Sequence, residues 1–361
     1  MKPEESQDLF VVSSSPHAHS GASITGIMLD VLIALAPATA VACYFFGWHA
    51  VRLIGVCVAS CCAVEWICRK LMKRENTLGD LSACVTGLLL ALTLPPQLPT
   101  WMAIAGSAFA IAVSKQVFGG LGRNPFNPAL AGRAFLLISC TGAMTTWSAS
   151  SWSTHLKSWA NDLAAAHATP LVNVQELTTA TPLGFAKAAF KNGDFVGQLQ
   201  VPWDFLKDLL FGINLNGSLG ETCAAALLLG GLYLIVRKVI TWHIPVAFIG
   251  TVFVYAEILK LCAPATALPP LIHIFSGGLF LGAIFMATDM VTSPITKKGQ
   301  LIFGLGCGVI TMVIRTSKTG AYPEGVCFSI LVMNAVVPLI NRACRNRVFG
   351  TKLPKNPVAQ A

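Results

Sequence analysis

Three carboxylates interrupt long apolar stretches of this sequence. Glu65, Glu257 and Asp289 each stand in or at the end of a run that is otherwise apolar enough to cross a membrane. An unpaired carboxylate at membrane depth is costly, so such residues commonly bind a cation or a proton. Carboxylate oxygens are also the ligands that hard cations prefer. The three residues are therefore candidates for an ion path.

Asp289 has the most favourable surroundings of the three carboxylates. Thr288, Thr292 and Ser293 place hydroxyl groups beside it, and Pro294 follows at once. A proline ends or breaks a helix and frees backbone carbonyls. The segment therefore offers several oxygen ligands around one carboxylate.

Glu65 and Glu257 have an alternative explanation. Arg69 follows Glu65 by four positions, and Lys260 follows Glu257 by three, so each pair shares one helix face. Both glutamates could then lie near the membrane interface, reach toward water and pair locally. The sequence leaves both explanations open.

A threonine-rich stretch, Leu177-Thr178-Thr179-Ala180-Thr181-Pro182-Leu183, lies in the longest polar connection. The proline biases Thr181 toward an extended backbone, which presents its hydroxyl outward. An accessible hydroxyl can carry a covalent group. The simpler alternative is a threonine-rich loop with no special role.

The sequence carries no recognisable metal-ligand set and no catalytic residue that we can name. Its 12 cysteines include no Cys-x-x-Cys pair, and its 7 histidines include no His-Glu-x-x-His pattern. Cys57, Cys61, Cys62 and Cys68 follow one apolar stretch, where free cysteine usually packs as a small hydrophobe.

The elements that must position these residues are membrane helices. Of 361 residues, 54% are hydrophobic and only 11% are charged, against about 25% charged in soluble proteins. The mean hydropathy is +0.66. These values exclude a disordered chain and a soluble nucleic-acid-binding protein, and they predict an all-α integral membrane protein that sits in a lipid bilayer.

Apolar runs of about 20 residues predict about ten transmembrane helices. The third and fifth runs are short, which predicts tilted, broken or partly re-entrant helices. The expected spans are 24–46, 51–68, 80–95, 101–118, 128–141, 219–236, 242–262, 270–289, 300–316 and 323–341.

Basic residues follow every second span, which predicts the orientation because short loops rich in Lys and Arg stay cytoplasmic. Arg52, Lys260, Arg315 and Lys318 are exceptions near the opposite face. Both termini are then cytoplasmic. The chain divides into a cytoplasmic segment (1–23), a first membrane half (24–141), an extracytoplasmic loop (142–218), a second membrane half (219–341) and a basic cytoplasmic tail (342–361).

The two halves repeat one pattern. Leu92-Thr93-Leu94-Pro95-Pro96 is followed by a helix to Lys115, a Gly- and Pro-rich loop at 119–128 and another helix. In the second half, a helix ending at Pro294 is followed by a helix to Lys318, a loop at 319–325 and another helix. An offset of five spans predicts two inverted five-helix repeats, although Gly and Pro clusters also simply punctuate membrane helices.

Four motifs, with the early Ser14-Ser15-Pro16-His17, resemble one family over nearly the whole chain. They are GGLGRNPFNP at 119–128, TTATPL at 178–183, SGGLFLGAIFMATDMVTSP at 276–294 and TGAYPEG at 319–325. The family comprises the D subunits of Rnf electron-transport complexes and the homologous B subunits of sodium-pumping NADH:quinone oxidoreductases (the NqrB/RnfD family). The chain is closer in length to the Rnf branch.

The resemblance implies a covalent cofactor. In this family FMN is attached through its phosphate to the last threonine of a short motif, which matches Thr181 here. Thr178, Thr179 and Pro182 complete that motif, although Thr178 and Thr179 depart from the Ser-Gly-Ala-Thr form. The attaching flavin transferase works outside the cytoplasm, on the side where the charge pattern places this loop. The resemblance leaves open whether a second, non-covalent flavin such as riboflavin is bound.

The resemblance also implies partners and a function. The chain would join the other Rnf subunits (A, B, C, E and G) in an inner-membrane complex that couples electron transfer between ferredoxin and NAD to Na⁺ or H⁺ translocation. The sequence does not distinguish the two ions. A secondary transporter or channel for a small solute is the main alternative, and a scaffold with a dispensable flavin is a third.

Overall fold

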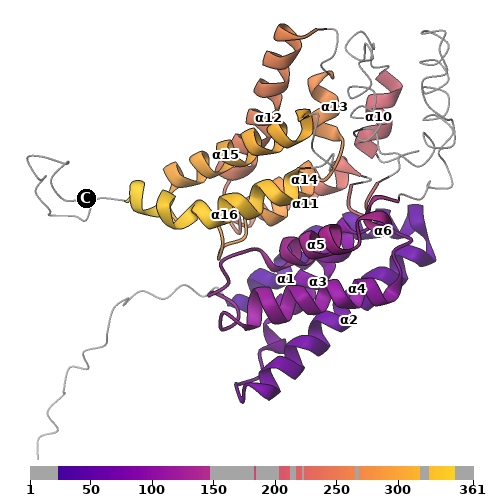
Figure 1. Ribbon diagram of the computed structural model, residues 1–361, viewed down its shortest axis with the longest axis vertical. Coiled ribbons are helices and arrows are strands. Elements are labelled where there is room, and N and C mark those ends of the chain that lie inside the picture. Colours follow the sequence, from indigo (N-terminus) through magenta and orange to yellow (C-terminus); the bar gives the residue numbers. More distant parts are fainter. Residues whose placement is uncertain are drawn as a thin grey trace, which may run out of the picture.

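The structure is a computed structural model that describes residues 23–146, 183, 203–211, 217–221, 223–264, 268–317 and 325–345. Every regular element in these ranges is a helix, which confirms the predicted all-α class (Figure 1). The first half of the chain occupies the lower part of Figure 1 and the second half the upper part.

The first half begins with two long helices and continues with shorter ones. Ser23 caps the first of them, because its Oγ accepts a hydrogen bond from Gly26 N. The elements are α1 (Ile24–Phe46), α2 (Trp48–Leu71), the 3₁₀ turn η1 (Leu78–Asp80), α3 (Ser82–Thr93), α4 (Thr100–Ala108), the π-helix η2 (Phe109–Gln116), α5 (Pro128–Ser139) and α6 (Thr141–Thr145).

The second half follows a similar plan with one extra break. Its elements are α10 (Trp203–Phe211), α11 (Ala224–Val236), α12 (His243–Cys262), α13 (Pro270–Phe275), α14 (Leu279–Leu281), the π-helix η4 (Gly282–Met286), α15 (Lys297–Thr316) and α16 (Val326–Ala343). The sequence predicted one continuous span at 270–289. That prediction was wrong, because the Ser276–Gly278 turn interrupts the helix and Gly277 has φ +77°.

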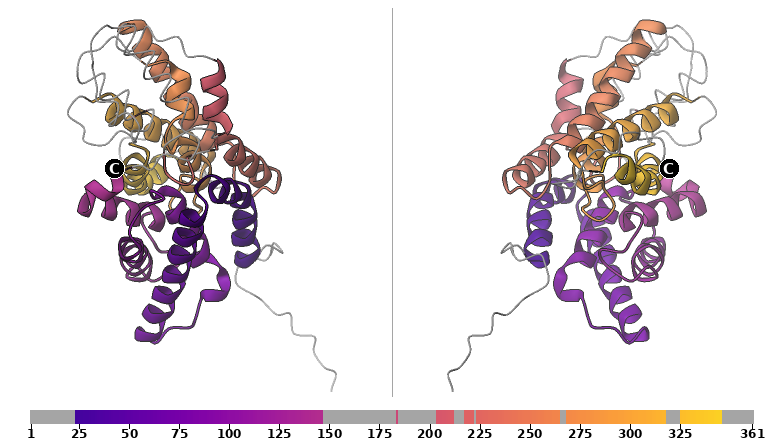
Figure 2. Two further views of the ribbon diagram at one scale, coloured as in Figure 1. Left: turned by 90° about the vertical axis from the view of Figure 1, so that its right-hand side faces the viewer. Right: turned by 90° about the vertical axis from the view of Figure 1, so that its left-hand side faces the viewer.

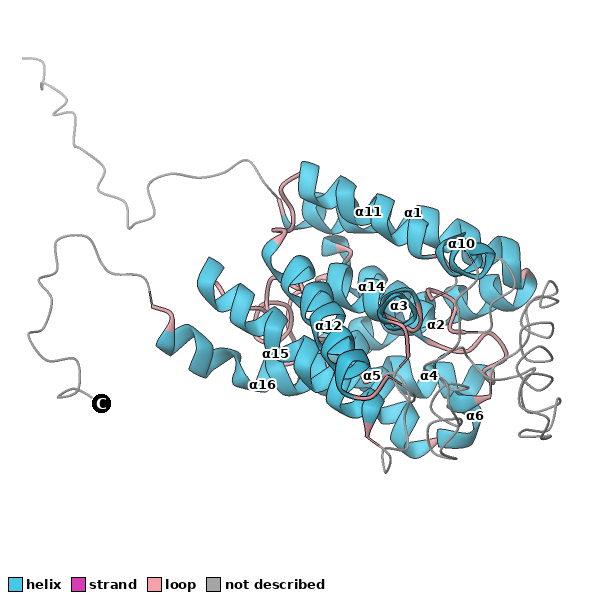
Figure 3. Ribbon diagram, turned by 90° about the horizontal axis from the view of Figure 1, so that it is seen from above, coloured by secondary structure: helices cyan, strands magenta, loops and turns pink. Residues whose placement is uncertain are grey.

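Corresponding helices of the two halves pack in corresponding ways. The α4–η2 unit packs on α2 and α5 in the first half, as α15 packs on α12 and α16 in the second. Across the halves, α1 lies along α11 (Figures 2 and 3) and α5 meets α16. This repeated packing supports the expected five-helix repeat.

Glycines allow the helices to approach closely. A Cβ on Gly304 of α15 would lie 2.7 Å from Ala247 Cβ of α12, and one on Gly308 would lie 2.6 Å from Thr251 Cβ. Such small-residue interfaces are typical of membrane helices, where close van der Waals packing holds helices together.

The outer surface suits a bilayer. Five helices (α1, α2, α12, α15 and α16) are long and apolar enough to span it, and α3, α5 and α11 are shorter apolar helices. Trp48, Trp101 and Trp242, at or next to helix starts, are each more than half exposed, as interfacial tryptophans are. The predicted shortness of the third and fifth spans is confirmed, because α3 and α5 have 12 residues each.

Candidate functional site

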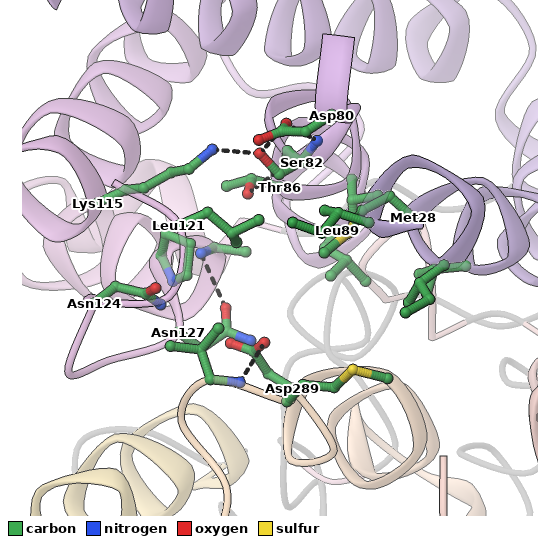
Figure 4. A pocket seen from close by; sticks show the side chains of 18 of the residues that line it. Met28, Asp80, Ser82, Thr86, Leu89, Lys115, Leu121, Asn124, Asn127 and Asp289 are labelled. Carbon is green, nitrogen blue, oxygen red and sulfur yellow. Dashed lines mark hydrogen bonds between the residues drawn. The ribbon is translucent and has the colours of Figure 1, made fainter. Parts of the chain in front are cut away.

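A cavity of about 460 Å³ lies where the two halves meet (Figure 4). The first half contributes α1, Arg69 of α2, η1, α3, the end of η2, the Gly-rich loop and the start of α5, and the second contributes α11, η4 and the segments that follow these two helices. Most of the lining is apolar. Its polar members include Asp80, Ser82, Thr86, Lys115, Asn124, Asn127, Thr288 and Asp289.

A buried ion pair stands behind one wall of this cavity. Lys115, near the end of η2, donates to both carboxylate oxygens of Glu65 on α2, at 2.8 and 3.0 Å. Glu65 also accepts hydrogen bonds from Gln116 Nε2 and Thr77 Oγ1, each at 2.9 Å. The glutamate is 0% exposed and the lysine 1%. A buried carboxylate needs such complete pairing, because desolvation would otherwise prevent its ionisation.

The network continues from Lys115 to the cavity surface. Lys115 Nζ donates to Ser82 Oγ at 2.6 Å, and Ser82 Oγ donates to Asp80 Oδ1 at 2.5 Å. Ser82 begins α3, and its backbone N donates to the same Asp80 oxygen at 2.8 Å. Hydrogen-bonded polar groups therefore lead from the protein interior to the cavity (Figure 4).

Asp289 lines the cavity from the second half. Its Oδ1 accepts a hydrogen bond from Val291 N at 3.4 Å, and its Oδ2 accepts one from Thr292 Oγ1 at 3.2 Å. Thr288 donates instead to the Ile284 carbonyl, one helical turn back. Of the hydroxyls that the sequence placed around Asp289, only that of Thr292 donates to it.

Asn127 joins the two halves beside Asp289. Its Oδ1 caps α5 by accepting from Ala129 N and Leu130 N, at 3.0 and 3.4 Å. Its Nδ2 donates to the Met286 carbonyl at 3.2 Å. In its hydrogen-bonding amide orientation, Asn334 of α16 accepts from Asn127 N and donates to the Thr292 carbonyl, both at 3.3 Å. The GGLGRNPFNP loop is thereby fastened to the segment that carries Asp289.

The local pairing suggested for Glu65 was wrong. Its partners come from η2 and the loop before α3, whereas the Arg69 guanidinium lies against Gly120 (φ +101°), where a Cβ would collide with it. Because Glu65 is fully buried, it does not reach toward water.

The remaining predicted residues lie apart from this cavity. Glu257 is partly exposed on α12 and does not line the cavity, and no ion pair joins it to Lys260 in the part of the chain that the structure describes. Thr178, Thr179, Thr181 and Pro182 lie outside the described residues. Leu183, directly after them, is buried.

Sequence reasoning missed several buried polar residues. It considered Lys115 only as the end of a helix, and it did not consider Arg133 and Glu221, which are buried 3.8 Å apart. Two of the four exceptions to the charge pattern now have a structural explanation. Arg315 donates to the carbonyls of His273 and Ser276, and Arg52 donates to that of Leu98. These two arginines donate hydrogen bonds to backbone carbonyls within the protein. Their positions therefore do not indicate on which side of the membrane they lie. For such pairs the sequence offered one signal, the helical spacing between a carboxylate and a basic residue. That spacing offered Arg69 as a partner for Glu65, whereas the structure pairs Glu65 with Lys115.

Comparison with known proteins decides the relationship. The sequence profile of the NQR2, RnfD, RnfE family matches residues 11–350. The chain belongs to this family. Its relatives in the family match over nearly their full length, so the resemblance expected from the four motifs is confirmed.

Three relatives illustrate the similarity. The D subunit of a Na⁺-translocating ferredoxin:NAD⁺ oxidoreductase complex from Acetobacterium woodii is 45% identical over 96% of this chain and 98% of the relative. The D subunit of a proton-translocating complex of the same activity from Clostridium ljungdahlii is 43% identical over the same shares. The D subunit of an ion-translocating oxidoreductase complex from Stutzerimonas stutzeri is 41% identical over 94% and 96%.

Proposed function

We propose that this chain is the D-type subunit of a membrane complex that couples electron transfer between ferredoxin and NAD to ion translocation. The near full-length identity to subunits of that name carries the proposal. The other subunits would be those expected from the resemblance (A, B, C, E and G), and the location a plasma (inner) membrane with both termini cytoplasmic.

Thr181 is the proposed attachment point for FMN, linked through its phosphate, with Thr178, Thr179 and Pro182 completing the motif that a flavin transferase recognises. Bound there, FMN would supply one- and two-electron transfer. Leu183 supports this proposal, because its burial anchors the chain directly after the motif to the helical body.

In-gel flavin fluorescence tests the attachment. The chain is produced in a host with an active flavin transferase, denatured in SDS and compared with the variants Thr181→Ala and Thr146→Ala, of which the second changes an exposed threonine outside the motif. We expect a fluorescent band in the wild type and in Thr146→Ala and a dark band in Thr181→Ala. A dark wild-type band would overturn the proposal of a covalent flavin.

Asp289 is the proposed ion-binding group at the cavity. The carboxylate lies between the two halves, where alternating-access transporters place their sites, and the Met286 carbonyl and the Asn127 side chain adjoin it. The Glu65–Lys115–Ser82–Asp80 network would set the charge of the opposite wall. A role for Glu257 in the ion path stays a prediction.

The cavity also suits a second, non-covalent flavin such as riboflavin. Its volume falls within the range of about 300 to 1,000 Å³ found for small-molecule sites. Met28, Leu89 and Phe285 supply apolar surface for a flat ring, and Asn124 offers an amide Oδ1 that is buried without a hydrogen-bond partner among the described residues. Non-covalent flavin released by acid from the purified complex, and identified by chromatography, would support this assignment.

A secondary transporter for a small solute remains the alternative, because the same inter-half cavity would serve it. One simple measurement distinguishes the two functions. The flavoprotein keeps its flavin after denaturation, whereas a transporter carries none.

A further inference from the structure

Three arginines converge on the Gly-rich loop that follows η2. Gly119 and Gly120 have φ +115° and +101°, a conformation that suits glycine and turns the chain sharply. A Cβ at Gly119 would lie 3.5 Å from Arg123 Nη1 and 3.7 Å from Arg74 Nη1. A Cβ at Gly120 would collide with Arg69 Nη2. Guanidinium groups from the loop and from the end of α2 therefore meet at two consecutive glycines.

No carboxylate pairs with these three arginines in the part of the chain that the structure describes. Asp80 lines the cavity together with Arg69, but it accepts its hydrogen bonds from Ser82. Arg69 Nε is buried without a hydrogen-bond partner among the described residues. Like charges at such short range repel each other, and buried donors without a partner are rare in folded proteins. A bound anion would relieve both costs.

A neighbouring tryptophan places the cluster near the surface of the bilayer. Trp66 precedes Arg69 by three positions on α2 and is 48% exposed, as tryptophans at a membrane interface are. Lys70 Nζ lies over the Trp66 ring, 4.9 Å from its centroid. Arg69 and Lys70 are both in the last turn of this helix. The arginines therefore lie at the depth of lipid headgroups.

Exposed apolar side chains adjoin the cluster on both segments. Leu71 follows Arg69 by two positions, and Val117 and Phe118 directly precede Gly119; all three are exposed. An anionic phospholipid offers a phosphate to the arginines and acyl chains to these apolar side chains. Inorganic phosphate and an acidic peptide offer only the charge. The combination of charged and apolar surface therefore favours a lipid.

We propose that Arg69, Arg74 and Arg123, gathered at Gly119 and Gly120, bind the phosphate of an anionic phospholipid headgroup. A guanidinium is always charged, and its paired N–H groups match phosphate oxygens. Basic pockets between membrane helices commonly bind such headgroups. The bound lipid joins the end of α2 to the Gly-rich loop. Because that loop also lines the cavity between the halves, the lipid steadies one cavity wall.

Native mass spectrometry of the full chain tests which ligand the site takes. The wild type is delipidated in detergent and titrated with phosphatidylglycerol or with phosphatidylcholine, and inorganic phosphate is added as a competitor. We expect phosphatidylglycerol to bind more tightly than phosphatidylcholine, because the choline cation of the latter would face the arginines. Inorganic phosphate at the concentration of the lipid should not displace phosphatidylglycerol. These comparisons do not require any variant to fold.

A pair of double variants tests whether the arginines form the site. Arg74→Gln with Arg123→Gln removes two exposed guanidiniums, and the affinity for phosphatidylglycerol should fall about fivefold for each arginine lost. Lys297→Gln with Lys298→Gln is the matched control. It removes the same charge from exposed lysines at the start of α15, on the face where the charge pattern also places the arginines. The control should bind the lipid like the wild type.

Several results would overturn the lipid site. Equal affinity of the wild type for the two lipids would remove the role of headgroup charge. Displacement of phosphatidylglycerol by inorganic phosphate would show that the site takes phosphate alone. Equal lipid affinities in the two double variants would show that the arginines form no specific site. Arginine-dependent binding of a polyglutamate peptide, without retention of phosphatidylglycerol, would identify a docking surface for an acidic protein instead.

Discussion

Lys115 Nζ lies 2.8 Å from Glu65 Oε2, although 50 positions separate the two residues in the chain. The contact fastens η2 to α2 and orients the lysine toward Ser82 at the cavity wall. Because both side chains are buried, water does not reach the remaining charge when its partner is removed. The stability of the first half and the charge of the cavity wall both depend on this pair.

Removing one partner of this ion pair should destabilise the protein more than removing both. Glu65→Gln leaves the Lys115 ammonium buried without a carboxylate, which costs about 3 to 5 kcal/mol. The double variant Glu65→Gln, Lys115→Met leaves no uncompensated charge and should recover part of this loss. Thermal unfolding in detergent, followed by size-exclusion chromatography, measures the difference. Equal losses in the single and double variants would contradict a coupled pair.

Asp289→Asn should uncouple ion movement from electron transfer while leaving the complex assembled. The amide keeps the shape of the side chain but not its charge, so cation or proton binding is lost. Ion uptake and ferredoxin-driven NAD reduction are measured together in inverted membrane vesicles. Asp30→Asn, which removes a carboxylate outside the cavity lining, is the matched control. A normal ion gradient in Asp289→Asn would refute the assignment.

Asn127→Ala should destabilise the junction between the halves. It removes the cap of α5, worth about 1 kcal/mol, together with the hydrogen bond to the Met286 carbonyl. Asn127→Ser keeps a neutral capping oxygen and loses the amide donor, so its unfolding temperature should fall less. The order alanine below serine below wild type is the expected result. An alanine variant as stable as the serine variant would show that the cap contributes nothing.

Thr86→Phe should fill part of the cavity and exclude a second flavin. Thr86 is buried and lines the cavity from α3, so a larger ring there occupies the space. Acid-released flavin should fall, while SDS-stable fluorescence stays unchanged. Leu229→Phe, on the exposed face of α11, is the control. Undiminished acid-released flavin would place that cofactor elsewhere.

Cysteine labelling tests the orientation. Cys262 is exposed at the end of α12, which the charge pattern places outside the cytoplasm. A membrane-impermeant maleimide should label it on intact cells, and Cys262→Ser should remove that signal. Cys344, at the end of α16, should react only after permeabilisation. Labelling of Cys344 on intact cells, and of Cys262 only after permeabilisation, would show that the topology is the opposite one.

The sequence alone determined the class of the protein and the positions of most spans. Apolar runs of bilayer length admit only helices, because backbone groups in lipid must bond within their own segment. The expected run at 24–46 therefore coincides with α1. The motifs were likewise enough to predict the family, since all four lie within residues 11–350, which the family profile matches.

Only the tertiary structure decided which charges meet. Helical spacing pointed Glu65 to Arg69, whereas packing gave it Lys115 from another helix and turned Arg69 toward the Gly-rich loop. The break at Ser276–Gly278 was hidden for a similar reason, because an apolar run does not show where the chain turns to admit Arg315. Hydropathy is a property of neighbours along the chain, but a buried charge is stabilised by whichever groups the fold brings within hydrogen-bonding distance.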